Sequence, residues 1–283
     1  MSNRLFAILI SSSLLAGCFA SDSDSNEEDS RLTLSLTDGA VDFAEQVNLE
    51  ITGVELKSNN DTHSFTFPTR TINLLDLQGS QSTALFTDEV LPAGDYQWVR
   101  LMVESASVVL TVDGGEIPLT IPSADQNGFK LVSGFTLPSN ASADFTLDLD
   151  VRKSITVTGS GNSLSYKLRP TMRLMNNISA GHIAGTVDGT LCNAETTASM
   201  AVYAYDDFDA TVDQEGSDNP PVASSLVNEA LDYEIGYLIE GNYTIALACF
   251  DTVDTVDSIE EVVTFIGAQD VTVIAKKTGD YSF

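Results

Sequence analysis

The chain has 283 residues, and its 13 lysines and arginines against 41 aspartates and glutamates give a formal net charge of -28 at pH 7. A surface this acidic repels phosphate backbones, so nucleic acid is excluded as a partner. The length exceeds one average domain and predicts two. The acidity is typical of solubility in a salty habitat, with cation binding as the alternative.

The start of the chain has the pattern of a secretory leader. Arg4 is its only charge before Cys18, and the run Leu5–Leu15 is apolar or hydroxylic but shorter than the about 20 residues that span a bilayer. With Ala16-Gly17 before Cys18, this stretch resembles the lipobox of bacterial lipoproteins. The resemblance implies a lipoprotein signal peptide over residues 1–17 and a Cys18 that carries lipid, including an acyl chain such as palmitate. An ordinary leader with an incidental cysteine is the alternative.

Residues 18–30 follow as an acidic, serine-rich stretch, which predicts a disordered tether. Phe19 comes after the cysteine, where many Gram-negative lipoproteins retained in the inner membrane have aspartate. This similarity favours a bacterial envelope protein that is lipid-anchored in the outer membrane. Beyond Cys18 the chain has two cysteines, Cys192 and Cys249, and outside the cytoplasm such a pair is most simply a disulfide. Two buried free thiols are the alternative.

Beyond residue 30 the pattern is that of strands, because apolar and polar residues alternate between turn residues. Leu32, Leu34 and Leu36 share one face of the first expected strand. Gly53 predicts a bulge, and residues 71–77 are expected to form an apolar strand. About a dozen short strands over residues 31–178 predict a β-sandwich.

Several motifs in this part together resemble a domain of unknown function that recurs in bacterial lipoproteins, DUF4382. The resemblance covers about residues 31–176, and its Gly39-Ala40 departs from the Ala-Pro that is more common in the family. It implies no activity, because the family is uncharacterised. The matching segments are Leu36–Asp42, Leu91–Leu101, Pro122-Ser123 with Gly128–Leu131, Asp148–Asp150, and Leu168–Pro170 with Arg173-Leu174.

The strand pattern restarts after a polar link, and residues 179–283 resemble the transthyretin-like or carboxypeptidase-regulatory-like sandwich. The resemblance rests on Val202–Tyr205, on Tyr233–Ile235 and on Leu238-x-x-Gly241-x-Tyr243. It implies a structural or interaction module. The expected fold class is therefore all-β, with two Greek-key sandwiches of immunoglobulin or transthyretin type after the signal peptide and the tether.

The spacing Leu-x-x-Gly-x-Tyr occurs twice, ending at Tyr96 and at Tyr243. It resembles the tyrosine corner of Greek-key sandwiches, which predicts structural roles for both phenols. Strand alternation places Tyr96 and Trp98 on one face, and Trp98 is expected in the core, with sugar stacking as the alternative.

Signs of catalysis are missing from the sequence. The two histidines, His63 and His182, form no metal-binding pair, and no nucleophile elbow is present. Carboxylate pairs arise by chance among 41 acids, so they identify no glycosidase. We predict no catalytic residues and no enzyme.

Calcium is the one cofactor that the sequence leaves open, because clustered carboxylates can bind it. The alternative is that these carboxylates are only solvated by water. Two sets of carboxylates are candidate ligands, one on the face of an expected strand and one in an acidic loop. They are Asp144, Asp148 and Asp150, and Asp206, Asp207, Asp209 and Asp213.

The sequence therefore indicates a lipid-anchored, non-catalytic binding or scaffolding module of the bacterial envelope. Its expected partners are the membrane, through the anchor, and an envelope protein or a glycan. The alternatives are a carboxylate-dependent glycan hydrolase and a calcium-dependent adhesin.

Overall fold

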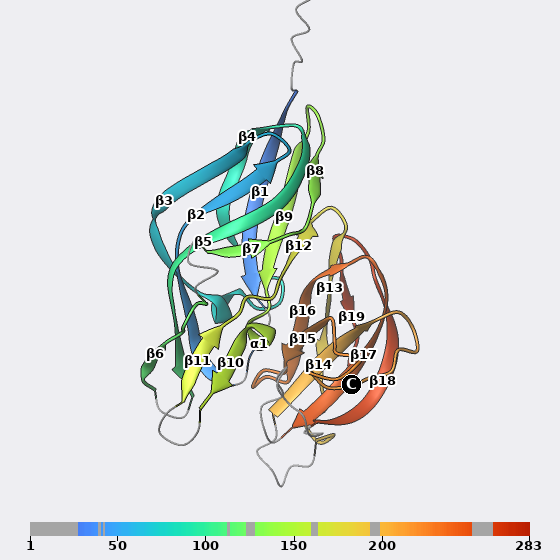
Figure 1. The fold of residues 1–283 in the computed structure, drawn as a ribbon. Coiled ribbons are helices and arrows are strands. Elements are labelled where there is room, and N and C mark those ends of the chain that lie inside the picture. The colour runs from blue at the N-terminus through green and yellow to red at the C-terminus, as the bar shows by residue number, and fades with distance from the viewer. Residues whose placement is uncertain are drawn as a thin grey trace, which may run out of the picture.

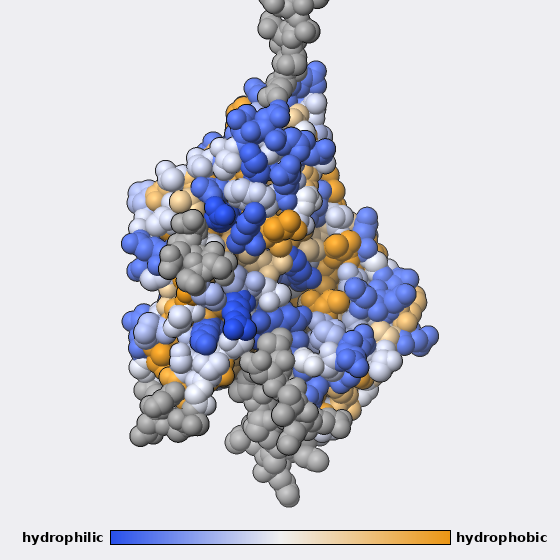
Figure 2. All heavy atoms as spheres, viewed as in Figure 1, coloured by the Kyte–Doolittle hydropathy of each residue, from blue (hydrophilic) through white to orange (hydrophobic). Residues whose placement is uncertain are grey.

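The computed structural model describes residues 28–38, 41, 43–111, 114–122, 128–159, 164–192, 199–250 and 263–283. Within them the protein is almost entirely β, which confirms the expected fold class (Figure 1). The expected signal peptide over residues 1–17 and Cys18 lie outside the described residues. No helix in the described part is long and apolar enough to cross a membrane. Hydrophilic residues cover much of the face in Figure 2, with small apolar patches among them.

The N-terminal sandwich packs two sheets face to face. One sheet has the order β12 (Met172–Asn176), β9 (Ser142–Leu149), β1 (Asp29–Asp38) and β4 (Thr83–Pro92). The other has the order β3 (Thr62–Asn73), β2 (Ala44–Ser58), β5 (Gly94–Leu110) and β6 (Glu116–Pro118), and β5 also pairs with β7 (Phe129–Leu131) and β8 (Phe135–Leu137). A hairpin of β10 (Ile155–Thr158) and β11 (Ser165–Leu168) follows the one-turn helix α1 (Val151–Ser154).

The core of this sandwich contains the leucine face expected from the sequence. Leu32, Leu34 and Leu36 on β1 are buried against apolar residues of β2 and β5. Because side chains alternate along a strand, the polar residues between these leucines face outward.

The C-terminal sandwich has its own core between two smaller sheets. One has the order β16 (Asp232–Ile239), β13 (Ala180–Thr186) and β19 (Thr278–Asp280). The other has the order β15 (Ala223–Leu226), β14 (Ser199–Asp206), β17 (Gly241–Phe250) and β18 (Val263–Val273). The expected disulfide joins Cys192 to Cys249 inside this core, which confirms the pairing.

The tether is shorter than expected, because β1 begins at Asp29. Asp29 pairs with Pro92 of β4. Ser30 is buried, and its hydroxyl donates to the carbonyl of Ala141 at 3.0 Å. An acidic, serine-rich composition predicts disorder only where no neighbouring strand supplies pairing, and here β4 does.

The predicted strand over residues 71–77 is wrong in its second half. Leu74–Leu77 form a 3-10 turn with both end residues buried, and the side chain of Asn73 caps it by accepting from the amide of Leu75 at 3.3 Å. The bulge expected at Gly53 is confirmed by a register shift in β2. A Cβ at Gly53 would lie 2.4 Å from the carbonyl oxygen of Phe65.

A second irregularity separates Tyr96 from Trp98. Ser58 pairs with Tyr96 and Lys57 with Trp98, so Gln97 is an extra residue on β5. Such a bulge changes the face on which the following side chains lie. Tyr96 is buried in the core, whereas Trp98 is half-buried and lies outside the core cluster. The expectation that both aromatic residues share one face, with Trp98 in the core, is therefore wrong.

Candidate functional site

The two sandwiches meet at α1, which the N-terminal sandwich presents to the C-terminal one (Figure 1). Two carboxylates hold this single helical turn. Asp150 caps it by accepting from the amide of Lys153 at 3.1 Å, and buried Asp38 accepts from the amide of Val151 at 3.0 Å. Aspartate at a helix start satisfies amides that have no partner within the helix. These bonds fix the directions in which the side chains of Arg152 and Lys153 leave α1.

Arg152 extends from α1 into an apolar cluster of the C-terminal sandwich. It is 1% exposed, and it donates to the hydroxyl of Tyr203 on β14 at 2.8 Å. Its guanidinium also lies 5.6 Å from the ring centre of Tyr203 and 5.7 Å from that of Phe250 on β17. A cation over aromatic rings contributes about 0.5–1 kcal/mol at exposed sites and about 2 kcal/mol or more when desolvated. Arg152 therefore links the two sandwiches through buried contacts.

Lys153 makes a second connection. Its ammonium donates to the carbonyl of Pro221 at 2.7 Å and lies 3.3 Å from Asp150 and 3.7 Å from Glu215. Glu215 is 1% exposed, and a carboxylate buried this deeply needs a positive neighbour. The loop that carries Glu215 is thus held against α1.

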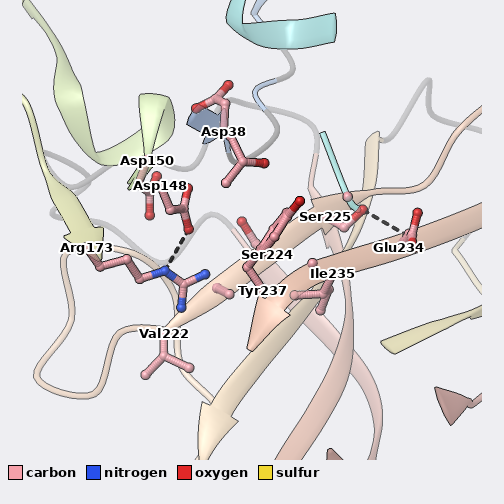
Figure 3. A pocket seen from close by; sticks show the side chains of 14 residues that line it. Asp38, Asp148, Asp150, Arg173, Val222, Ser224, Ser225, Glu234, Ile235 and Tyr237 are labelled. Atoms are coloured by element: carbon pink, nitrogen blue, oxygen red, sulfur yellow. Dashed lines mark hydrogen bonds and ion pairs between the residues drawn. The ribbon is translucent and has the colours of Figure 1, made fainter. Parts of the chain in front are cut away.

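A small polar cavity lies beside this junction (Figure 3). Asp38, Asp148 and Arg173 of the N-terminal sandwich line it from one side, and Ser224 and Tyr237 of the C-terminal sandwich are among the residues on the other. Its volume is about 20 Å³, which is room for about one water molecule. No substrate of the size of a sugar fits there.

Arg173 and Asp148 form an ion pair in this cavity. The Nε of Arg173 donates to Oδ2 of Asp148 at 2.6 Å. Burial opposes the charge of Arg173, but the attraction and hydrogen bond of Asp148, together with the attraction of Asp150 and Tyr243, outweigh it, so the pKa of Arg173 is raised. The other oxygen of Asp148 is buried without a protein partner, and a water in the cavity would satisfy it.

The backbones of the two sandwiches also touch beside the cavity. A Cβ on Gly236 of β16 would lie 1.8 Å from the carbonyl oxygen of Gly79. Next to them, the hydroxyl of Tyr237 donates to the carbonyl of Ser80 at 3.2 Å. Only glycine permits this approach at position 236.

A shallow hollow of about 570 Å³ opens next to the cavity. Asp232, Glu234 and Asp280 line part of it, together with Tyr233. Burial and the carboxylate of Asp280 raise the pKa of Tyr233 well above its ordinary value. The phenol therefore stays protonated and donates to the carbonyl of Tyr281.

The first set of calcium candidates does not lie on one strand face. Asp150 follows the end of β9 and caps α1, Asp148 pairs with Arg173, and exposed Asp144 accepts from the amide group of Asn177 at 3.0 Å. The expectation of one shared face is therefore wrong for Asp150, because the chain turns into α1 after Leu149.

The second set lies at the end of β14 and in the loop after it. Asp206, Asp207 and Asp209 are exposed, while Asp213 turns its backbone to the hydroxyl of Tyr205. Among the described residues, no three carboxylate, histidine or cysteine side chains are placed to hold a metal ion.

Both tyrosines of the repeated spacing make the bond of a tyrosine corner. Tyr96 donates to the carbonyl of Pro92 at 2.9 Å, and Tyr243 donates to that of Ile239 at 2.8 Å. Each phenol thus reaches back four residues and fixes the turn that precedes its own strand.

The residues of the junction were not found from the sequence. Arg152 and Lys153 are neighbouring bases and Glu215 is one acid among many, and burial against distant parts of the chain has no local pattern. One local signal was present, because Asp150 precedes two bases and a serine as a helix cap would.

The family comparison identifies the N-terminal part. The profile of the family described as Domain of unknown function (DUF4382) matches residues 29–170, which is half of the chain. The chain therefore belongs to this family, as the sequence motifs predicted. No curated protein matches the sequence.

Solved structures with some likeness have low scores. The TIE protein of Bacillus anthracis is 11% identical with a TM-score of 0.22, and the match covers 89% of this chain and 33% of that one. GBS52, the minor pilin of Streptococcus agalactiae, is 12% identical with a TM-score of 0.21, and the match covers 89% of this chain and 94% of that one. BcpA, the major pilin subunit of Bacillus cereus, is 9% identical with a TM-score of 0.22, and the match covers 90% of this chain and 99% of that one. The chain spans a third of the first of these proteins, and likenesses at these scores carry no argument.

Proposed function

We propose that the protein is a non-catalytic binding or scaffolding module of the bacterial envelope, anchored in the outer membrane by lipid on Cys18. The domains are the expected residues 31–178, extended to Asp29 by β1, and residues 179–283, held together at α1. The observation that carries the proposal is the position of β1, which begins at the end of the N-terminal sandwich that points away from the C-terminal one (Figure 1). A chain attached at that end would present its second sandwich away from the membrane.

The buried carboxylates of the junction are not placed for hydrolysis. A glycan hydrolase needs two carboxylates about 5–10 Å apart with room for a sugar between them. Buried Asp38 and Asp148 line a cavity of about 20 Å³, which admits one water. Their bonds to Val151 and Arg173 hold the fold at the junction. These carboxylates thus have structural partners and no access for a substrate.

The test measures the lipidation and the membrane attachment of the protein in a Gram-negative host. Cys18→Ala is compared with wild type and with Ser12→Ala, a control substitution in the same leader. We expect wild type and the control to take up labelled palmitate and to sediment with the outer membrane, and Cys18→Ala to do neither. A wild-type protein that takes up no label and stays in the soluble fraction would overturn the proposal.

Protease treatment of intact cells then separates display at the surface from a periplasmic orientation. Release of the folded part by added protease places the ligand outside the cell, and protection places it in the periplasm.

A further inference from the structure

Four side chains form a basic platform on the outer face of the larger N-terminal sheet. They are Lys57 on β2, Trp98 and Arg100 on β5, and Lys130 on β7, and we call them the Trp98 platform. Lys57 is paired with Trp98, and Arg100 with Lys130. Directly opposed residues have Cβ atoms about 4.5–5.5 Å apart, so the four side chains form one continuous surface.

Both cations next to the indole contact it. Nζ of Lys130 lies 4.7 Å and Cζ of Arg100 lies 5.0 Å from the ring centre of Trp98. Arg100 is also paired with Glu55 at 2.8 Å. The three bases therefore outnumber the one acid bonded to them, on a chain whose formal net charge is -28. The platform is a local positive site on an acidic protein.

This charge selects an anionic ligand, because a positive patch attracts the charge that the rest of the surface repels. The aromatic ring adds an apolar surface with a polar edge, which suits a ligand that is itself ring-shaped and partly apolar. The ammonium groups of Lys57 and Lys130 can each donate charge-assisted hydrogen bonds to a carboxylate. A polymer of acidic sugars combines these features.

The sheet topology favours a polysaccharide over an acidic peptide. Extended peptides are commonly bound by addition to an open sheet edge. β5 is paired with β2 at Trp98, and on its other side β7 pairs with Val99–Leu101 and β8 with Gly94–Tyr96, so these strands leave only a two-residue gap for an added strand. A gap this short favours recognition by side chains on the sheet face.

We propose that the Trp98 platform binds an acidic polysaccharide. Its carboxylates pair with Lys57 and Lys130, beside the ion pair of Arg100 and Glu55, and a sugar ring lies against the indole of Trp98. The inference deepens the proposed function, since it names the ligand class of the binding module.

Trp98 is the one tryptophan of the chain, so its fluorescence reports directly on the platform. The full chain in detergent is titrated with polygalacturonate, with neutral dextran, and with poly-glutamate. We expect a saturable change of emission with polygalacturonate and none with dextran. The double variant Lys57→Gln with Lys130→Gln should bind about tenfold more weakly, as expected for two exposed charge pairs.

The matched control is Lys276→Gln with Lys277→Gln, which removes the same charge from the C-terminal sandwich and should bind as wild type. Unchanged emission with polygalacturonate overturns the proposal, as does equal affinity in the platform variant. Tighter binding of poly-glutamate would show that the platform recognises acidic peptides, and it also overturns the proposal. None of these results affects the test of Cys18, so the two proposals can fail separately.

Discussion

Replacing Gly236 with alanine should loosen the junction between the sandwiches. The added Cβ would lie 1.8 Å from the carbonyl oxygen of Gly79, whereas carbon and oxygen approach no closer than about 3.3 Å. The two backbones must then separate by about 1.5 Å. This movement breaks the bond from Tyr237 to Ser80, which is 3.2 Å long.

The expected loss can be estimated from two terms. A broken hydrogen bond removes about 1 kcal/mol, and an overpacked site adds about 1–3 kcal/mol. We therefore expect Gly236→Ala to lower the free energy of unfolding by about 2–4 kcal/mol. The loss belongs to the contact between the sandwiches, since Gly236 touches Gly79 of the other one.

The assay combines urea unfolding with hydrogen exchange of the segments around Gly79 and Gly236. The control is Gly241→Ala in the same sandwich, whose Cβ would meet no atom closer than 3.8 Å. Both variants restrict the unfolded chain equally, so their difference isolates the contact. Unchanged unfolding and exchange in Gly236→Ala would show that the two backbones do not meet as described.

Three further predictions concern the cores and one titrating group. Replacing Cys192 and Cys249 together with alanine should lower the stability by about 4 kcal/mol, because the disulfide closes a separation of 57 residues; urea unfolding with and without reductant measures this. Tyr96→Phe and Tyr243→Phe should each lower the free energy of unfolding by about 1 kcal/mol, since each removes one corner bond. Urea unfolding measures this loss, and the slope of the unfolding free energy against urea concentration should not change. Burial lowers the pKa of His182 below its ordinary 6.5, with Glu234 opposing. Neutral His182 therefore contributes fully to stability above the pKa that it has in the unfolded chain, and this contribution is lost as the pH falls through its pKa in the folded protein. The thermal midpoint of wild type should therefore fall more between about pH 7 and 5 than that of His182→Gln.

Features that rest on local spacing could be predicted from the sequence. Leu32, Leu34 and Leu36 are buried because a strand repeats every two residues. The corner bonds of Tyr96 and Tyr243 follow from a turn of fixed length before each strand.

Features that depend on distant parts of the chain could not be predicted from the sequence. A single extra residue, Gln97, places Trp98 on the outer face of the sheet, and the sequence between Tyr96 and Trp98 contains no glycine or proline to signal the bulge. Arg152 is buried only because Tyr203 and Phe250, far away in the sequence, surround it. Without those partners its charge predicts exposure.

The acidity of the chain makes a final prediction about the Trp98 platform. At about 0.01 M salt the Debye length is about 30 Å, so a polyanion approaching Trp98 also experiences the rest of the chain, whose formal net charge is -28. At about 0.15 M salt the Debye length is about 8 Å, and the nearby charges of Lys57, Arg100 and Lys130 dominate. At about 1 M salt those attractions are screened as well. Binding of polygalacturonate, followed by the fluorescence of Trp98, should therefore be strongest at intermediate salt. A steady fall in affinity from the lowest salt upward would show that the platform does not act against an opposing field.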